Sequence, residues 1–285
     1  MTSINDHPSS KFVKLLLLGD AKTGKTTSLA DLLRLDLKLR IVDMDNLLDS
    51  FVYFVKTKYP DKIGNVEYRT IRDRRAMTEL GPQISGPPKA FTTAIKMMDH
   101  WRYTEDDGTK VDLGRPDTWG PDCVLVIDSL SRLCDAAFDW REPLTPRGKS
   151  GDYDRRATYK DAQDAVEDML ATLTSDAFET NIIVICHGLY QDLPDGMTKI
   201  FPQGVGQKLS PKIPQYFPSY IRYKNQGGKR TIQLKSDPLI DLANPNPAAI
   251  PDTLDMDGGL GKFFELLRGK PEPKTALLKP TLKRA

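Results

Sequence analysis

Gly19-Asp20-Ala21-Lys22-Thr23-Gly24-Lys25-Thr26 is the segment from which the rest of the chain is best understood, since it fits G-x-x-x-x-G-K-[ST] at every position. Glycine lets the backbone curl until its N–H groups point inward and cradle phosphate oxygens. In this pattern Lys25 reaches the β- and γ-phosphates, and the hydroxyl group of Thr26 binds Mg²⁺. We therefore predict ATP and Mg²⁺ as cofactors, with the nucleotide bound by Gly19, Asp20, Ala21, Lys22, Thr23, Gly24, Lys25, Thr26 and Thr27.

Strands and helices alternate along the first two thirds of the chain. Apolar runs without helical periodicity predict buried strands over residues 12–18, 39–42, 66–71, 123–127 and 181–186. Helical spacing predicts helices over residues 26–35, 46–58, 91–103, 130–140 and 155–178. Gly and Pro predict a loop over 81–89. Residues 104–122 are polar and also contain Gly and Pro, so they are predicted to form an irregular segment at the surface. This alternation predicts an α/β fold, a mostly parallel sheet with helices on both faces.

The C-terminal third differs in composition and in hydrophobic periodicity. Residues 188–218 are rich in Gly, Pro, Lys and Gln and are predicted to form a loop, and 219–235 alternate around Asn225-Gln226-Gly227-Gly228, which predicts a β-hairpin. Residues 260–267 have the spacing of a short amphipathic helix. We expect disorder in 1–10, one domain over 11–243, and a C-terminal extension over 244–285 that ends in a Lys- and Pro-rich tail.

Composition excludes several classes of protein. The net charge of +2 excludes a molecule that binds polyanions over its whole surface. Three cysteines and three scattered histidines argue against a disulfide framework and a zinc site. The longest strongly apolar run, residues 15–18, is far shorter than a membrane span, and the first ten residues lack the core of a signal peptide. We expect no membrane contact and a cytoplasmic location.

Asp128 directly follows the predicted strand 123–127. Parallel α/β sheets bind their ligands at the carboxyl ends of the strands, and a phosphate-binding loop requires an acid there to hold the Mg²⁺ shell. We predict that Asp128 and Thr26 hold the metal together. An aspartate that caps the following helix is the alternative.

Three segments, in this order, resemble RecA-type ATPases. Leu39–Asp49 resembles the segment whose second acid polarises the attacking water, Val126–Leu130 resembles the Asp-Ser after the metal-binding strand, and Ile183–His187 resembles the strand that ends in the γ-phosphate sensor. The closest resemblance, over residues 12–240, is to short phage-encoded RecA-like ATPases of recombination and single-strand annealing.

This resemblance implies catalytic roles for Lys25, Asp45 and His187, with Asp43 as the alternative to Asp45. Two departures are visible. Asp45 stands where these relatives usually carry glutamate, and His187 replaces the amide of RecA itself. A shorter carboxylate can still orient water, and an imidazole N–H can still donate to a phosphate oxygen.

The resemblance also implies DNA-binding loops after the metal strand and after the sensor strand. Residues 188–235 contain eight basic and two acidic residues, with aromatic residues such as Tyr190, Tyr220 and Tyr223 among them. Cations beside aromatic rings suit single-stranded DNA. The DNA-binding candidates are Lys199, Lys208, Lys212, Arg222 and Lys224.

RecA-type sites are completed by a cation from a neighbouring subunit, for which Arg230 and Lys235 are the candidates. The partners implied are single-stranded DNA, further copies of this chain in a ring or filament, and a single-stranded DNA-binding protein. Two other functions stay open: a nucleotide or nucleoside kinase with an arginine lid, and a non-catalytic ATP switch acting with a protein partner.

Overall fold

The computed structural model describes residues 11–147, 151 and 154–268. Its centre is an eight-stranded sheet in the order β14-β13-β12-β1-β9-β8-β2-β3. The six strands from β12 to β3 are parallel, and β13 and β14 extend one edge in antiparallel fashion. The strands are β1 (Lys14–Gly19), β2 (Lys38–Asp43), β3 (Val66–Thr70), β8 (Gly120–Asp128), β9 (Thr180–Cys186), β12 (Ser219–Gln226), β13 (Lys229–Gln233) and β14 (Thr253–Asp255).

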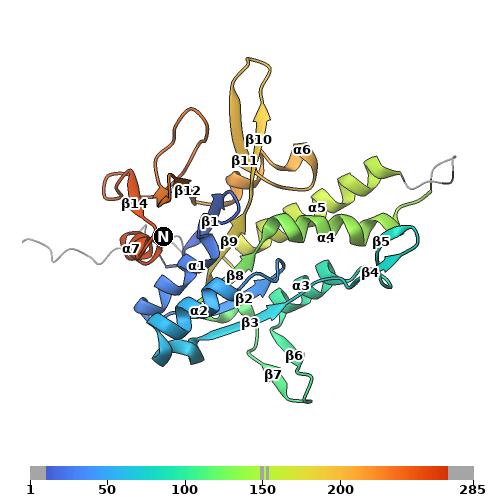
Figure 1. Cartoon of the computed structure of the whole chain (residues 1–285), viewed down its shortest axis with the longest axis horizontal. Coiled ribbons are helices and arrows are strands. Elements are labelled where there is room, and N and C mark those ends of the chain that lie inside the picture. The colour runs from blue at the N-terminus through green and yellow to red at the C-terminus, as the bar shows by residue number, and fades with distance from the viewer. Residues whose placement is uncertain (1–10, 148–150, 152–153, 269–285) are drawn as a thin grey trace, which may run out of the picture.

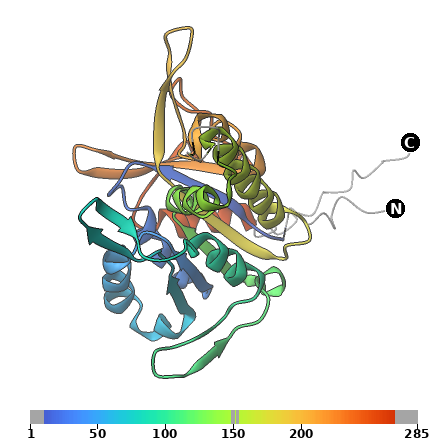
Figure 2. The ribbon, with the colours of Figure 1, turned by 90° about the vertical axis from the view of Figure 1, so that its right-hand side faces the viewer.

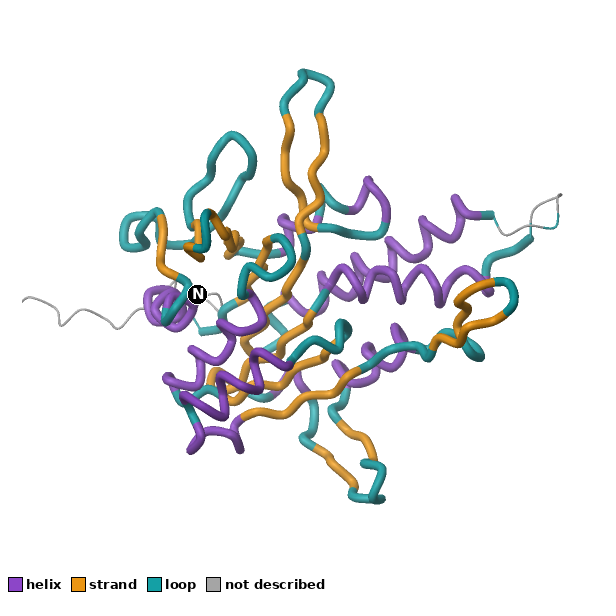
Figure 3. Tube along the Cα trace, viewed as in Figure 1, coloured by secondary structure: helices purple, strands orange, loops and turns teal. Residues whose placement is uncertain are grey.

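Helices cover both faces of this sheet, which confirms the predicted fold class (Figure 1, Figure 3). One face carries α1 (Lys25–Ser28), the 3₁₀ helix Leu29–Leu35, α2 (Asp49–Lys58) and α7 (Gly259–Arg268). The other carries α3 (Ala90–Asp99), α4 (Leu130–Arg141) and α5 (Arg155–Thr174). Because both faces are covered, the central strands are apolar along their length, as in β1, where Leu15 and Leu17 face one layer and Leu16 and Leu18 the other.

The predicted helix over 26–35 is α-helical only in α1 and continues as a 3₁₀ helix. Either type of helix would show the same apolar face in the sequence, because seven residues are too few to distinguish 3.0 from 3.6 residues per turn. Other predicted helices are shorter in the structure: α2 begins at Asp49, α3 ends at Asp99, and α5 ends at Thr174.

Three antiparallel hairpins replace segments predicted as loops or helix. They are β4 (Arg75–Thr78) with β5 (Gly81–Ile84), β6 (Arg102–Thr104) with β7 (Lys110–Asp112), and β10 (Gly188–Asp192) with β11 (Thr198–Pro202). Both β10–β11 and β6–β7 project from the sheet, at opposite ends of the molecule (Figure 2). Since most of their residues are not fully buried, these ribbons lack the apolar alternation that marks a strand in a sequence.

The remaining short elements are the helix α6 (Gly206–Leu209) and the 3₁₀ turns Pro60–Asn65, Pro116–Thr118, Glu142–Leu144 and Ile213–Tyr216. The predicted hairpin over 219–235 is confirmed as β12–β13. Among the described residues, none of the helices has the length and apolarity needed to cross a bilayer. The disorder predicted for 1–10 and for the tail concerns residues outside those described.

The C-terminal extension is part of this architecture. Strand β14 pairs with β13, and α7 buries Leu260, Phe263 and Phe264 on the layer that also holds the 3₁₀ helix. The approach is close, since a Cβ added to Gly261 would lie 3.0 Å from the carbonyl oxygen of Asp31. The sheet therefore reaches residue 255, beyond the domain limit of 243 expected from the sequence.

Candidate functional site

The loop from Gly19 to Thr26 connects β1 to α1 at the carboxyl end of the sheet. Gly24 has a φ of 97°, where a side chain is strained. Gly19 is extended but crowded, because an added Cβ would lie 2.7 Å from the carbonyl oxygen of Tyr223 on β12. Glycine is therefore required at both positions, once for backbone conformation and once for space.

Met256, just after β14, covers Gly24. A Cβ built on Gly24 would lie 2.1 Å from Sδ of Met256, so the C-terminal segment contacts the loop directly. On the other side, the hydroxyl groups of Ser28 and Tyr223 are 2.7 Å apart, which joins α1 to β12. The loop is thus held by two elements that lie far away in the sequence.

Lys25 is buried, and its ammonium group donates to the carbonyl oxygens of Gly19 at 2.7 Å and Asp20 at 2.9 Å. Burial lowers the pKa of Lys25, against the opposing charge of Asp128. The side chain therefore crosses the loop where the sequence places phosphate oxygens. Ala21 and Lys22 are exposed at the tip, and Thr27 is half-buried in α1.

Thr26 and Asp128 come together as predicted. Oγ1 of Thr26 donates to Oδ2 of Asp128 at 2.6 Å, and Asp128 is only 4% exposed. Burial raises the pKa of Asp128 to about 6, although the hydrogen bond from Thr26 acts in the opposite direction. The peptide bond between Asp128 and Ser129 is cis.

The donor chemistry of this pair fits Mg²⁺. A hydroxyl and a carboxylate are hard oxygen ligands, and Mg²⁺ usually takes one or two protein oxygens beside phosphates and water. Within residues 11–147, 151 and 154–268, no cluster of three or more His, Cys, Asp or Glu side chains could hold a metal by itself. Thr26 and Asp128 would hold the ion together with a nucleotide.

Asp45 lies beside this pair, and basic side chains surround it. Its carboxylate is 3.8 Å from Nε2 of His187 and 3.3 Å from Nε of Arg132. Burial alone would raise the pKa of Asp45, but hydrogen bonds with His187 and Ser129 and the charge of Arg132 outweigh it, so the pKa is lowered. Asp45 is therefore an ionised, proton-accepting group at neutral pH.

Asp43 has a different environment, although it is only two residues away. Its Oδ1 accepts hydrogen bonds from the backbone N–H groups of Asp45 and Asn46 at 3.1 and 2.7 Å. Its Oδ2 accepts from the hydroxyl of Thr70 at 2.7 Å. These bonds fix the turn that presents Asp45, so the geometry favours Asp45 over Asp43 as the residue that faces the site.

Ser129 of the Asp-Ser pair, together with two residues of α4 that the sequence analysis did not single out, completes this region. Ser129 caps α4, with its Oγ 3.4 Å from the N–H of Arg132, and Ser131 accepts from the N–H of His187 at 3.1 Å. A serine before a helical pattern is the usual N-cap signal, so the capping role of Ser129 could also have been predicted. Arg132 carried no signal, because its partner Asp45 lies in the turn after β2, far away in the sequence.

The basic residues predicted to bind DNA are mostly engaged with the protein. Lys199 pairs with Asp241 at 2.5 Å, Lys212 with Glu167 at 2.8 Å, and Lys224 with Asp237 at 3.9 Å. Arg222 is 8% exposed. Lys208 is exposed and has no ion-pair partner among the described residues.

The predicted aromatic surface is partly wrong. Tyr220 and Tyr223 are buried because strand β12 places them on the covered faces of the sheet, and Phe217, just before β12, is buried in one of the two core layers. Tyr190 on β10 is 50% exposed, and its hydroxyl donates to Oδ2 of Asp20 at 3.0 Å. The hairpin after the sensor strand thereby touches the loop at its second residue.

The candidate trans-acting cations lie at the antiparallel edge of the sheet. Lys235 pairs with Asp252 at 3.0 Å, and both side chains are exposed. Arg230 on β13 is exposed and has no ion-pair partner among the described residues. Among the described residues, neither side chain forms an ion pair with residues 19–26, and their role as trans-acting cations stays a prediction.

A family match covers most of the chain. A family model described as an AAA domain matches residues 11–242. This match confirms the prediction of a RecA-like P-loop ATPase domain, while the closer resemblance to phage-encoded proteins stays a prediction. A search of curated proteins finds no match.

Similar solved structures include a RadB recombinase, with 15% identity, a TM-score of 0.40, and coverage of 78% of this chain and 79% of that chain. An ATPase of the type III secretion system of pathogenic bacteria has 12% identity and a TM-score of 0.41, over 75% of this chain and 52% of that one. The ATP synthase subunit NeqB of Nanoarchaeum equitans has 10% identity and a TM-score of 0.36, over 76% and 50%.

Proposed function

This chain belongs to the AAA domain family, and we propose that it is a Mg²⁺-dependent ATPase that binds single-stranded DNA and acts as a ring or filament in DNA recombination, annealing or repair. The observation that carries the proposal is the convergence of Lys25, Thr26, Asp128, Asp45 and His187 at the carboxyl end of the sheet. These residues come from four separate strands or their following turns.

Each group has a role that its environment supports. Lys25 would bind phosphate oxygens, and Thr26 with Asp128 would hold Mg²⁺, which neutralises phosphate charge when bound. Asp45, kept ionised by His187 and Arg132, would orient the attacking water and accept its proton. His187 contacts Asp45 and directly follows β9, the strand beside β1, so it is placed to respond when the γ-phosphate leaves.

The DNA-binding part of the proposal rests on the β10–β11 hairpin and the following residues 203–218. The ion pairs of Lys199 and Lys212 each include a well-exposed partner, and such pairs contribute only about 0–1 kcal/mol. A DNA phosphate can therefore replace the carboxylate at small cost, while counterion release favours the exchange. Lys208 is available without any exchange.

The test is ATP hydrolysis by the full chain with and without a single-stranded oligonucleotide, alongside a mass measurement of the assembly. We expect turnover that needs Mg²⁺, rises several-fold with DNA, and is abolished by Lys25→Ala. Lys38→Ala is the matched control, since Lys38 is exposed at the opposite end of the sheet. Turnover by a strict monomer that ignores DNA would overturn the proposal.

The two alternative functions give different products. A nucleotide or nucleoside kinase would transfer phosphate to a nucleoside or nucleoside monophosphate, whereas an ATPase releases inorganic phosphate. A non-catalytic switch would still hold intact ATP after long incubation. Analysing the nucleotides after incubation with Mg²⁺ therefore separates the three functions.

A further inference from the structure

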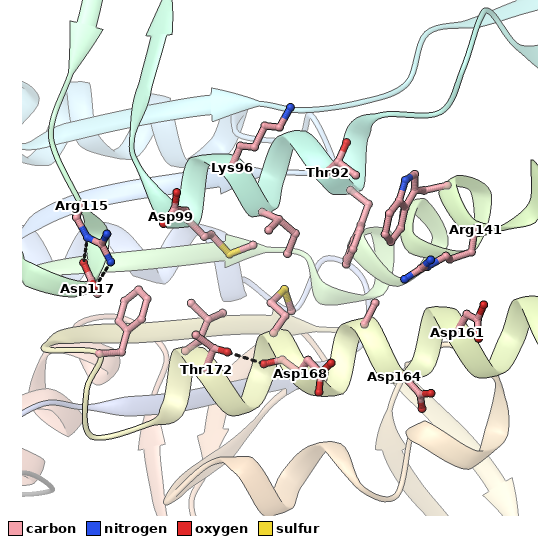
Figure 4. Close-up of a pocket in the computed structure, with 18 residues that line it drawn as sticks. Thr92, Lys96, Asp99, Arg115, Asp117, Arg141, Asp161, Asp164, Asp168 and Thr172 are labelled. Carbon is pink, nitrogen blue, oxygen red and sulfur yellow. Dashed lines mark hydrogen bonds and ion pairs between the residues drawn. The ribbon is translucent and has the colours of Figure 1, made fainter. Parts of the chain in front are cut away.

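A groove of about 730 Å³ lies between α3 and α5, and none of its lining residues belongs to the nucleotide loop (Figure 4). Its floor is apolar, and Phe91 and Trp140 stack there with ring centroids 5.2 Å apart. Other apolar residues that line it are Ile95, Met98, Met169, Leu173 and Phe178. The groove is large enough for several side chains of an extended peptide.

The rim of the groove carries more acidic than basic side chains, since five aspartates line it beside Lys96, Arg115 and Arg141. Asp161, Asp164 and Asp168 recur at helical spacing along α5 and are exposed, so they form a line of negative charge on one side. None of the three has an ion-pair partner among the described residues. Asp99 adds a further carboxylate, while Asp117 is already paired with Arg115. The groove therefore suits an occupant that is both apolar and basic.

Helix α7 packs on the opposite face of the sheet from this groove, and its last residue contacts the start of β8. The guanidinium group of its last residue, Arg268, donates to the carbonyl oxygen of Pro121 at the start of β8. The neighbouring Gly120 donates to Glu179, which in turn donates to the carbonyl oxygen of Asp117 on the groove wall at 2.8 Å. Residue 268 is thus linked to the groove wall only through these hydrogen bonds at the start of β8.

The remaining sequence, residues 269–285, matches the groove in chemistry and length. It contains five basic residues and one acidic residue, with Leu277, Leu278 and Leu282 between the lysines. Three prolines favour an extended chain, and a segment of this length can span on the order of 50 Å. Its leucines would cover the apolar floor while its lysines meet the aspartates on α5.

We propose that residues 269–285 bind in the groove between α3 and α5 of the same chain. The attraction between lysines and aspartates on a solvent-exposed rim is screened by salt, so docking weakens as ionic strength rises. Docking also pairs the positive charges of the tail with protein carboxylates. This proposal does not depend on the nucleotide site or on DNA binding.

The three native cysteines are buried, which allows a single introduced cysteine to be labelled. The full chain with Thr281→Cys carries a benzophenone maleimide, is irradiated, and is digested for mass spectrometry. We expect cross-links to α3 and α5 within single chains, and a yield that falls several-fold at high salt. Cross-links found elsewhere, or found only between two chains, would overturn the proposal.

Charge reversal on the rim tests the same contact. Asp164→Lys with Asp168→Lys should lower the yield at least fivefold, whereas the matched pair Asp106→Lys with Asp107→Lys, exposed beyond the β6–β7 strands, should leave it unchanged. Leu277→Asp with Leu278→Asp should lower it equally, and this change lies outside the folded region described. An unchanged yield in the tail variant contradicts docking, even if the groove variant fails to fold.

Discussion

The hydroxyl group of Tyr190 donates a hydrogen bond to Oδ2 of Asp20, 170 positions earlier in the chain, at 3.0 Å. This contact joins the β10–β11 hairpin to the nucleotide loop. Arg222 lies buried beside Tyr190 and interacts with it. A ligand that moves the hairpin would therefore also displace Asp20 in the nucleotide loop.

Tyr190→Phe removes this hydrogen bond but keeps the ring. On the proposed function, we expect DNA stimulation of ATP turnover to fall at least threefold, because the hairpin is no longer hydrogen-bonded to the nucleotide loop. Basal turnover should fall much less. The measurement is steady-state hydrolysis across DNA concentrations. Tyr53→Phe, at an exposed position of α2, is the control, and equal stimulation in both variants would contradict the coupling.

Asp45→Asn keeps the shape of the side chain and removes its charge. We expect turnover to fall by on the order of 100-fold, since the group that orients and deprotonates water is lost. Calorimetry should show nucleotide affinity within about threefold of the original, because Lys25 and the loop are unchanged. Asp135→Asn removes the other carboxylate paired with Arg132 and serves as control. Near-normal turnover in Asp45→Asn would reject the assignment.

Asp43→Ala should affect stability first. It leaves two backbone N–H groups and the Thr70 hydroxyl without their acceptor. A fully buried polar group without a hydrogen-bond partner costs about 1–3 kcal/mol. We expect the free energy of unfolding in urea to fall by about 2–3 kcal/mol. Thr70→Val, which removes one of these partners, should cost less. A loss of turnover without loss of stability would instead give Asp43 a direct catalytic role.

Asp31 makes the stability of the protein depend on pH. Burial, with Asp257 nearby, raises the pKa of Asp31 from 3.8 to about 6. The folded state therefore holds this proton more tightly than the unfolded state, so the contribution of Asp31 is full below pH 4 and is lost as pH rises through 6. The loss is at most about 3 kcal/mol.

Asp31→Asn has no proton to lose. We expect the free energy of unfolding of the variant, minus that of the original chain, to increase between pH 4 and pH 7 and then level off. Urea denaturation at several pH values measures it. Asp36→Asn, an exposed position at the end of the same 3₁₀ helix, should give a difference that does not follow this curve. A flat difference for Asp31→Asn would refute the shifted pKa.

The sequence predicts the centre of this fold well and its periphery poorly. Strands β1, β8 and β9 are covered on both faces, so each appears as an apolar run between helices. The loop after β1 and the acid after β8 follow from chemistry that needs those residues at those places. The hairpins β4–β5 and β6–β7 have no buried residue, and β10–β11 adds only Ile200 to the hydrophobic core, so no continuous apolar pattern is required.

Charge and burial show where sequence information ends. The excess of lysine in residues 188–235 is visible in the sequence, but the carboxylates that pair with it, Asp241 and Glu167, lie outside that segment. In the same way Tyr220 and Tyr223 look like a DNA-stacking surface until the sheet places them in the core. Ion-pair partners and burial both depend on which distant segments come together in the fold, and a single sequence does not contain that information.

The contact of Met256 with Gly24 bears on how this protein should be trimmed for laboratory work. The family match stops at residue 242, which invites a clone with that boundary. Such a clone would lose β14 and α7, and α7 covers the leucines of residues 29–33. Apolar side chains would then be exposed to water, and the nucleotide loop would lose its contact with Met256. A useful minimal version should run to Arg268, and shorter ones are expected to precipitate.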